Sequence, residues 1–508
     1  MQVDSPARIR NIAIAGHNDT GKTTLASSLL FAGGAAPRFG KIEDGNTITD
    51  FDPEETERGI SIGLAVAHLP WRQHKVNLLD SPGYGIFFSE IRTALRVADC
   101  AVVCVNAVAG AEVNTEKVWE AAADLDLPVI LHLNKMDRER ADLGRCLESL
   151  QSTFGRQILP VQLPIGSEKE FVGVIDLVKM KAFRFERDGS GKGKEEAIPA
   201  DLLAGANEAR TRLIEAVAEA DEHLLEKFFE EGTLEAADLE SGLRSAIAAR
   251  KLFPVTLGSS LHLVGSSALL DFLVDYAPSP ANHPYPAKGI DGSSVPIEAD
   301  PEKPAVALVF KTLNDPFTGR LSILRVLSGT LQNDAQMWNV RAEEMEKMHG
   351  LVHLQGKTGT ATTKLIAGDI GGVPKMRLAL SGDTLSAKEQ SVSAEWIPLP
   401  EPAMSFAIEP KSKGDDEKIG DALHRLIEED PSLRAGRDPQ THEFLLSGSG
   451  QLHVEITLAR MKRRSNVEVI LHPPKVPYRE TIQKPAEGHG RHKKQSGGRG
   501  QFADCRIK

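Results

Sequence analysis

The hydrophobic and polar positions over the first part of the chain form an alternating pattern. Runs of consecutive aliphatic residues, at 10–16, 76–80, 100–107 and 128–135, alternate with segments of helical spacing. Consecutive apolar positions indicate strands buried on both faces, and helices between them are typical of crossover connections in a parallel sheet. The pattern therefore predicts a doubly wound α/β sheet as the first part of a multidomain α/β protein.

This pattern is interrupted between residues 155 and 252. Residues 171–189 have the pattern of a β-hairpin, and residues 195–232 are helical and acidic. A further strand and helix then resume the α/β alternation before residue 280. We therefore predict a first domain over residues 1–280 that contains an insertion at about 155–252.

Four further regions follow the first domain. Residues 281–304 are rich in Pro, Gly and Ser and predict a linker. Residues 305–400 alternate short apolar runs with turns, which predicts a small β-barrel. Residues 401–478 predict a small α+β unit in the order strand–helix–strand–helix–strand, and residues 479–508 begin another unit.

Composition and charge exclude several classes of protein. The chain of 508 residues has a net charge of −11, which argues against a uniformly basic nucleic-acid coat, so we expect no DNA partner. Its 4 cysteines match no disulfide or zinc pattern and fit reduced thiols in a cytoplasmic protein. No apolar run approaches ~18 residues, so we expect no membrane span. Nothing in the pattern indicates a coiled coil, so we expect a monomer.

The segment GHNDTGKT, residues 16–23, fits G-x-x-x-x-G-K-[ST] directly after a strand and at the start of a helix. Its glycines let backbone N–H groups approach phosphate oxygens, and the helix N-terminus favours an anion. Lys22 can place its ammonium between β- and γ-phosphates, and Thr23 can offer its hydroxyl to Mg²⁺. We predict nucleotide contacts from Gly16, His17, Asn18, Asp19, Thr20, Gly21, Lys22, Thr23 and Thr24.

The segment DSPG, residues 80–83, lies where a second strand of the sheet should end. Asp80 can hold Mg²⁺ through water, and the Gly83 N–H can bond a γ-phosphate oxygen. Ser61, in the upstream segment ERGIS, can complete the Mg²⁺ shell, although a polar loop with a helix cap explains that segment equally well. The predicted contacts here are Asp80, Ser81, Pro82, Gly83 and Tyr84.

The segment NKMD follows another strand and predicts the base-binding end of the site. A carboxylate at Asp137 can accept two N–H donors from guanine, whereas adenine would leave that carboxylate poorly paired, so the site should select GTP over ATP. The segment GSS, from Gly258, ends one more strand and can present backbone N–H groups to the guanine oxygen. The predicted contacts are Asn134, Lys135, Met136, Asp137, Ser259, Ser260 and Leu261.

In this order the motifs resemble those of the translational GTPases. The stretch LPVQLPIGSEKEFVGVIDLVKMKA narrows the resemblance to the elongation factor G family, because it is similar to that family's G-prime insertion. DPFTGRLSILRVLSGTL, AIEPKSKGDDEKIGDALHRLIEEDPSL with LLSGSGQLHVEITLARMKRR, and VPYRETI with SGGRGQF resemble its domains II, III and the start of IV. The resemblance implies GTP and Mg²⁺ as cofactors and the ribosome, its rRNA and proteins, as partner.

Tyr84 departs from the family, which usually carries at this position a His that orients the attacking water. A phenol with a pKa of ~10 is a poor base near pH 7, but it can hydrogen-bond water in a reaction that needs little base chemistry. We therefore assign catalysis to Lys22, Gly83 and Tyr84, with slow ribosome-stimulated hydrolysis. The alternative is a ring that packs over the site without a catalytic part.

The resemblance predicts a ribosome-associated GTPase that drives or assists movement of tRNA and mRNA. Its pattern stops at residue 508, about one strand into domain IV, which we interpret as a piece of a longer product. Alternatives are a GTP-gated ribosome-binding module without useful turnover and a ribosome-protection or release-type GTPase. Lys493, Lys494, Arg499 and the segment RMKRR at 460–464 can face rRNA, or can be an ordinary solvated loop and helix surface.

Overall fold

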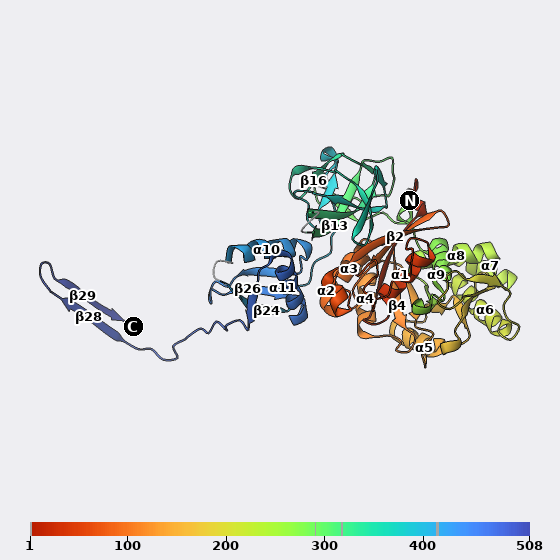
Figure 1. The fold of residues 1–508 in the computed structure, drawn as a ribbon, viewed down its shortest axis with the longest axis horizontal. Helices are drawn as coiled ribbons and strands as arrows, with labels where there is room; N and C mark the ends of the chain where they lie inside the picture. Colours follow the sequence, from red (N-terminus) through yellow and green to blue (C-terminus); the bar gives the residue numbers. More distant parts are fainter. Residues whose placement is uncertain (1–2, 290, 316–318, 413–415) are drawn as a thin grey trace.

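The computed structural model describes residues 3–289, 291–315, 319–412 and 416–508. The α/β part, the β-rich part and a small α+β part contact one another, while a terminal hairpin lies apart at the end of an extended segment (Figure 1). Residues 316–318 and 413–415 fall within two stretches that carry the family resemblance, and residue 290 falls within the predicted linker. All of these lie outside the described residues.

The first part is built on a seven-stranded sheet in the order β2-β3-β1-β4-β5-β11-β6. Its strands are β1 (Ile9–Gly16), β2 (Ala65–Trp71), β3 (His74–Asp80), β4 (Cys100–Asn106), β5 (Val129–Asn134), β6 (Ile158–Pro160) and β11 (Phe253–Leu257). The four predicted strands β3, β1, β4 and β5 are parallel neighbours, as expected. Edge strand β2 pairs antiparallel with β3 and was not predicted; its Pro70 argues against a central strand, and Pro is tolerated at an edge.

Helices cover both faces of this sheet. They are α1 (Lys22–Ala32), α2 (Pro53–Arg58), α3 (Phe88–Arg96), α4 (Val113–Asp124), α5 (Leu143–Phe154) and α9 (Ser266–Tyr276). Alternate residues of β1 belong to two separate apolar cores: Ala13 packs in the core that includes α3 and α4, and Ile14 in the core that includes α1 and α9. Burial on both faces is what the continuous apolar runs predicted.

The inserted segment forms its own small layer. Its four-stranded sheet, in the order β10-β9-β8-β7, is followed by three helices. The elements are β7 (Gln162–Ile165), β8 (Gly173–Asp176), β9 (Lys181–Arg184), β10 (Lys194–Glu196), α6 (Leu203–Glu219), α7 (Glu222–Glu231) and α8 (Ala236–Ala248). The predicted hairpin is β8 with β9, while β6, inside the predicted insertion range, pairs with β11 of the main sheet.

The β-rich part is an eight-stranded sheet in the order β17-β16-β22-β13-β14-β21-β18-β19, with the pair β15-β20 beside it. The strands are β13 (Val306–Asp315), β14 (Gly319–Ser328), β15 (Thr330–Gln332), β16 (Gln336–Asn339), β17 (Glu344–Lys347), β18 (Val352–Gln355), β19 (Thr358–Ala361), β20 (Lys364–Ile366), β21 (Ile370–Pro374) and β22 (Thr384–Ser386). Part of the predicted linker is ordered, because β12 (Ala287–Gly289) pairs antiparallel with β23 (Val392–Ala394).

The small α+β part packs α10 (Asp416–Glu429) and α11 (Gln451–Ser465) on a four-stranded sheet in the order β25-β26-β24-β27. The strands are β24 (Met404–Pro410), β25 (Arg434–Arg437), β26 (Phe444–Gly448) and β27 (Val469–His472). The predicted order missed one strand, because β25 has the sequence RAGR and no apolar run. The terminal hairpin is β28 (Gly488–Lys494) with β29 (Gln501–Ile507). No helix in the described ranges combines the length and apolar character needed to cross a membrane.

Candidate nucleotide site

A cavity of about 270 Å³ opens where β1, β3 and β5 end, at the edge of the main sheet. Ligands of open α/β sheets bind at this edge. Of the residues predicted from the sequence, the cavity is lined by Asn18, Asp19, Gly21, Lys22, Thr23, Thr24, Ser61, Gly83, Tyr84, Asn134, Lys135, Asp137 and Leu261. It is also lined by Gly59 and Ile60 of the segment ERGIS, and by three residues that were not among the predicted contacts, Ile42, Glu43 and Arg138.

The remaining predicted residues stand behind this lining. They are Gly16, His17, Thr20, Asp80, Ser81, Pro82, Met136, Ser259 and Ser260. Several brace the lining directly: the carbonyl of His17 accepts from Lys22 Nζ at 2.6 Å, and that of Thr20 accepts from Asn134 Nδ2 at 2.9 Å. Others join loops to strands, as when Ser81 Oγ donates to the carbonyl of Ile14 at 2.8 Å.

The phosphate loop depends on two glycines. Gly16 has φ +139°, and a Cβ there would lie 2.3 Å from the carbonyl oxygen of Cys104. Gly21, the N-cap of α1, has φ +88°, and a Cβ there would lie 2.5 Å from Asn134 Nδ2. The loop therefore needs glycine for both conformation and space. It directs Lys22 along the cavity, where a Cβ on Gly83 would lie 2.4 Å from Lys22 Nζ.

Lys22 is 6% exposed, and burial lowers the pKa of its ammonium, while nearby acidic groups oppose the shift. Its Nζ donates to a backbone carbonyl, that of His17, at 2.6 Å. A buried cation held by a neutral carbonyl is well suited to an anionic ligand.

Hydroxyl and carboxylate oxygens gather beside the phosphate loop. Thr23 Oγ1 lies 2.9 Å from Ser61 Oγ, and Thr49 Oγ1 donates to Asp80 Oδ2 at 2.6 Å. Asp80 Oδ1 is buried and has no hydrogen-bond partner among the described residues. Burial raises the pKa of Asp80 to about 6, and burial together with the charge of Asp80 raises that of Asp50 to about 7.

This group of oxygens fits a bound Mg²⁺. Mg²⁺ prefers hard oxygen ligands, few of them from protein, and an unpartnered buried carboxylate oxygen is a group that a cation or its water would satisfy. Thr23, Ser61 and Asp80 were predicted from motifs. Thr49 and Asp50 were not, because they lie in a segment without periodic pattern and reach the cluster through the tertiary fold alone.

At the other end of the cavity, the segments NKMD and GSSL are joined to each other. Asn134 Oδ1 accepts hydrogen bonds from the backbone N and from Oγ of Ser260, both at 2.9 Å. Ser259 Oγ donates to Asp137 Oδ1 at 2.5 Å, and the Met136 N–H donates to the Gly258 carbonyl at 3.2 Å. The two motifs, more than a hundred residues apart, thus form one rigid pocket around the buried carboxylate of Asp137.

Tyr84 lies between the cavity and an apolar cluster. It lines the cavity, and its ring packs on a cluster of Ile62, Phe87 and Ile456. The preceding carbonyl, that of Gly83, accepts from Asn114 Nδ2 at 2.8 Å. The ring therefore packs as one interpretation expected, and a role of its hydroxyl toward water stays a prediction.

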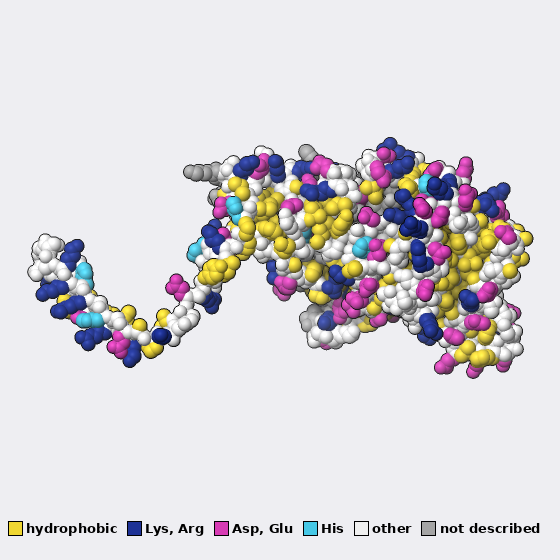
Figure 2. All heavy atoms as spheres, turned by 90° about the horizontal axis from the view of Figure 1, so that it is seen from below, with side chains coloured by type: hydrophobic (Ala, Val, Ile, Leu, Met, Phe, Trp, Pro, Cys, Tyr) yellow, Lys and Arg dark blue, Asp and Glu magenta, His cyan; other side chains and the backbone are white. Residues whose placement is uncertain are grey.

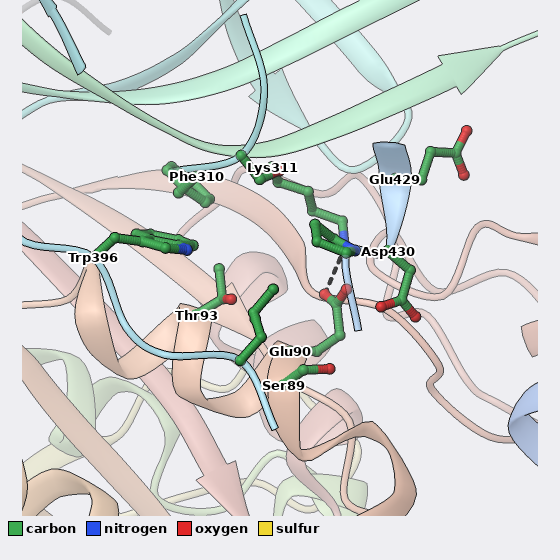
Figure 3. A pocket seen from close by; sticks show the side chains of 11 residues that line it. Ser89, Glu90, Thr93, Phe310, Lys311, Trp396, Glu429 and Asp430 are labelled. Atoms are coloured by element: carbon green, nitrogen blue, oxygen red, sulfur yellow. Dashed lines mark hydrogen bonds and ion pairs between the residues drawn. The ribbon is translucent and has the colours of Figure 1, made fainter. Parts of the chain in front are cut away.

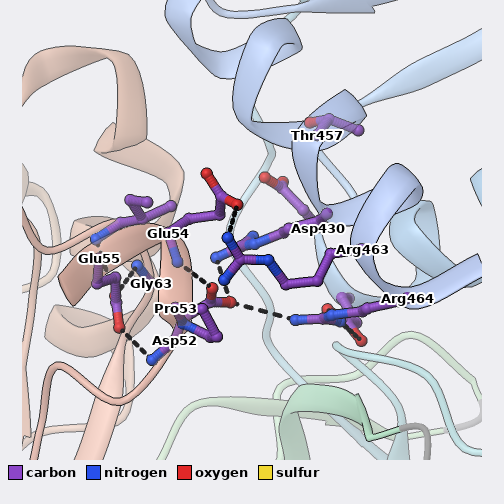
Figure 4. Close-up of polar contacts among 12 residues, drawn as sticks. Asp52, Pro53, Glu54, Glu55, Gly63, Asp430, Thr457, Arg463 and Arg464 are labelled. Atoms are coloured by element: carbon purple, nitrogen blue, oxygen red, sulfur yellow. Dashed lines mark hydrogen bonds and ion pairs between the residues drawn. The ribbon is translucent and has the colours of Figure 1, made fainter. Parts of the chain in front are cut away.

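The segment that leads to Ser61 is attached to the small α+β part. Helix α2 begins with a capping box between Asp52 and Glu55, and Glu55 Oε1 also accepts from the N–H groups of Ile62 and Gly63 at 2.9 and 3.0 Å. Three arginines of α11 face α2 (Figure 4). Their ion pairs are Arg460 with Asp52 at 3.0 Å, Arg463 with Glu54 at 3.1 Å and Glu57 at 2.7 Å, and Arg464 with Asp52 at 3.2 Å and Glu429 at 2.8 Å.

The arginines of the segment RMKRR have acidic partners that neither sequence interpretation included. Arg460, Arg463 and Arg464 pair with acidic groups at α2 and in α10, although Arg463 itself is exposed. Contact of this segment with rRNA stays a prediction. By contrast, Lys493, Lys494 and Arg499 of the terminal hairpin are exposed, and Figure 2 shows Lys and Arg side chains gathered along it.

A second contact joins the α/β part to the β-rich part near the site. Glu90 of α3 accepts from the Leu64 N–H at 2.6 Å and pairs with Lys311 of β13 at 2.5 Å (Figure 3). The small pocket beside this pair, about 20 Å³, also borders Asp430 of the α+β part. Through Lys311, α3 and the Leu64 backbone are thereby linked to the β-rich part, which is called the barrel below after its predicted fold.

Comparison with known proteins agrees with this architecture. The Elongation factor Tu GTP binding domain family matches residues 7–279, Elongation factor G domain 2 matches 304–388, domain III matches 399–473 and domain IV matches 474–508. Elongation factor G of Mycoplasma pneumoniae is 37% identical over 500 residues, which cover 98% of this chain and 73% of that protein. A Thermus thermophilus protein of known crystal structure superposes with a TM-score of 0.87 at 37% identity, covering 98% of this chain and 72% of that one.

The family matches cover most of the chain and follow the order of its structural parts. The sequence-based resemblance and fold class are thereby confirmed. The chain belongs to the elongation factor G family of ribosome-associated translational GTPases.

Proposed function

We propose that this chain binds GTP with Mg²⁺ in the cavity described above and hydrolyses it on the ribosome in support of tRNA and mRNA movement. The observation that carries the proposal is one cavity that joins a buried ammonium, a cluster of oxygen ligands and a buried carboxylate in a line. The family match supports the GTPase activity, and the geometry supports the assignment of each end.

In this proposal each group of residues binds a different part of the nucleotide and its metal. Lys22 and the N–H groups of the loop from Gly16 hold the phosphates at the N-terminus of α1. Thr23, Ser61 and Asp80 hold Mg²⁺, Asp80 through water. Bound in this way, Mg²⁺ would neutralise charge on the β- and γ-phosphates.

Asp137 selects the base. Its carboxylate can accept two hydrogen bonds from guanine, and Asn134 holds the surrounding loop in place. Gly83 approaches the phosphates closely because it has no side chain, and its N–H can report whether the γ-phosphate is present. Loss of the contact between the Gly83 N–H and the γ-phosphate would release the segments around Ser61 and Gly83. Because α2 precedes Ser61, this release would also loosen the ion pairs between α2 and α11.

The domain assignment follows the same reasoning. We propose a GTP-binding domain at 1–280, a joint at 281–304, a barrel at 305–400, an α+β domain at 401–478 and the start of a further domain at 479–508. We also propose a cytoplasmic monomer without a DNA partner. The exposed Lys493, Lys494 and Arg499 would contact rRNA phosphates with salt-dependent affinity.

Nucleotide selection tests the core of the proposal. We expect the protein with Mg²⁺ to bind GTP at least about a hundredfold more tightly than ATP, because ATP leaves Asp137 unpaired. Titration of both nucleotides by calorimetry measures this ratio, with Asp137→Ala as the variant that should lose it. Equal affinity for GTP and ATP would exclude the proposed site.

A second function is favoured by the packing of Tyr84 on Ile62, Phe87 and Ile456. If that packing is its whole role, the protein is a GTP-gated ribosome-binding module with little turnover. Two variants separate the possibilities, because Tyr84→Phe keeps the ring and removes the hydroxyl, whereas Tyr84→Ala removes both.

Single-turnover GTP hydrolysis with and without ribosomes gives the answer. If the hydroxyl positions water, Tyr84→Phe should lower the ribosome-stimulated rate by about tenfold or more. If only packing matters, Tyr84→Phe should match the parent and Tyr84→Ala should not. No stimulation by ribosomes in the parent chain would support the gated module instead of the enzyme.

A further inference from the structure

The buried carboxylate of Asp137 has a neighbour that no sequence motif indicated. Its side chain is 8% exposed, and Oδ1 is held by Ser259 Oγ at 2.5 Å. Near the other oxygen, Oδ2, lie His262 Nε2 at 3.7 Å and Arg138 Nε at 3.8 Å. Because the side chain of Arg138 is 57% exposed, His262, at 23%, is the better-ordered of the two neighbours.

His262 is itself held by the inserted segment. Its Nδ1 lies 2.9 Å from Asp188 Oδ1, and its backbone carbonyl accepts from the Asp188 N–H at 3.0 Å. Asp188 lies in the loop between β9 and β10, far from the NKMD and GSS motifs in sequence. A side-chain contact and a backbone contact to one residue restrict both the position and the rotation of the imidazole ring.

The loop that carries Asp188 is anchored to the start of α9. The Ser267 N–H donates to the Gly191 carbonyl at 3.1 Å, and the Gly193 N–H donates to Ser267 Oγ at 2.9 Å. The insertion is thus not a separate appendage at this point. Its β9–β10 loop is fixed to the start of α9 and, through Asp188, to the strand-to-helix connection, residues 258–265, that supplies Ser259 to the pocket.

The chemistry of base recognition makes orientation matter. A carboxylate discriminates guanine only when both oxygens lie in the plane of the base, since one accepts from the ring N–H and the other from the 2-amino group. Ser259 holds one oxygen by a hydrogen bond, and the imidazole, itself held by Asp188, lies 3.7 Å from the other. The ring has a carboxylate at each nitrogen, Asp188 at Nδ1 and Asp137 at Nε2.

We propose that His262 is a positioning residue for guanine recognition and that Asp188 of the insertion holds it in place. The insertion would then contribute to the nucleotide specificity of the domain that it interrupts. This inference rests on the proposed GTP site and deepens it.

The test compares GDP with inosine diphosphate (IDP), which lacks the 2-amino group. For the parent chain with Mg²⁺, calorimetric titration should give tighter binding of GDP. We expect His262→Gln to weaken GDP by about tenfold with a much smaller effect on IDP, so that the GDP-to-IDP affinity ratio collapses. Asp188→Asn should lower the ratio by about threefold, because it weakens the hold on His262 without removing the ring.

Two further variants sharpen the result. His262→Lys places a cationic donor beside Asp137 without the ring, and should retain part of the ratio that His262→Gln loses. His349→Gln is the matched control, because His349 makes a similar contact to a carboxylate, 2.7 Å from Asp334, on the barrel surface. That variant should leave both affinities unchanged.

The affinity ratios of the variants decide whether His262 has this role. A GDP-to-IDP ratio unchanged in both His262→Gln and Asp188→Asn overturns the inference, as does an equal loss of both nucleotides, which would indicate a general structural role. If His262→Gln does not fold, Asp188→Asn still carries the test, because the Asp188 side chain is 70% exposed. A parent chain that binds neither nucleotide overturns the proposed function and this inference with it.

Discussion

The GTPase domain meets its two neighbours through interfaces of opposite character. Toward the barrel, Lys75 of β3 is completely buried, and its Nζ lies 2.7 Å from Asp369 Oδ1 and 2.9 Å from His353 Nδ1. Nearby, Arg325 of the barrel pairs with Asp99 at 2.5 Å, and both side chains are buried. Toward the α+β part, the α2–α11 ion pairs are more exposed and range from Arg460 with Asp52, at 17% and 12%, to Arg463 with Glu57, at 37% and 63%.

The difference in exposure between the two sets of ion pairs indicates which of the two interfaces can open. A buried ion pair that loses one partner leaves a charge without solvent, so the barrel interface resists separation. Partly exposed pairs can exchange protein partners for water at small cost. We therefore expect the barrel to keep its place on the GTPase domain, and the α2–α11 contact to form and break as the segment around Ser61 changes.

Removal of Asp369 should have the largest effect. Burial already lowers the pKa of Lys75 although Asp369 opposes the shift, so Asp369→Ala leaves an ammonium that the interface cannot solvate. We expect the free energy of unfolding to fall by about 3–5 kcal/mol, measured by chemical denaturation. The double variant Lys75→Met with Asp369→Leu should recover most of this loss, and a single variant within about 1 kcal/mol of the parent would contradict a locked interface.

Acidification should weaken the same interface by a smaller amount. Burial, with the charge of Lys75, lowers the pKa of His353 to about 4, below its ordinary value of ~6.5. Between pH ~6.5 and about 4, His353 binds a proton in the unfolded chain but not in the folded chain. The contribution of neutral His353 to the free energy of unfolding is therefore complete above pH ~6.5 and declines as the pH falls toward about 4. Unfolding curves over this range should be steeper in pH for the parent than for His353→Gln, and identical slopes would argue against a neutral His353.

Loss of one α2–α11 contact should have the smallest effect on stability. Arg463→Ala should change the free energy of unfolding by no more than about 1 kcal/mol. It should nevertheless slow ribosome-stimulated GTP hydrolysis by about two- to fivefold, because α2 loses an anchor next to Ser61.

The matched control for that variant is Arg212→Ala, which breaks an exposed pair with Glu208 on α6, away from both interfaces. It should leave the hydrolysis rate unchanged. If Arg463→Ala destabilises the chain as strongly as Asp369→Ala, the two interfaces do not differ in the way described.

Much of the nucleotide site could be predicted from local sequence. The phosphate loop is one example, because Gly16 and Gly21 set a backbone path within eight residues and Lys22 and Thr23 follow from it. The strand ends at Asp80 and Asn134 are another, since continuous apolar runs place them at one edge of a parallel sheet. Strand β25 was not predicted because RAGR has no apolar run, and β2 was not predicted because His68 and Pro70 interrupt its apolar positions.

The chain by itself determined the type of ligand, through short motifs whose chemistry depends on neighbours in sequence and on the period of buried strands. Only the tertiary structure decided what holds those motifs in place: Thr49 and Asp50 beside Asp80, Asp188 behind His262, and the arginines of α11 against α2. These partners lie tens to hundreds of residues apart, and ordinary polar residues carry no signal of which distant group will satisfy them. A buried polar group needs a hydrogen-bond or ionic partner, and the tertiary fold determines which residue lies close enough to provide it.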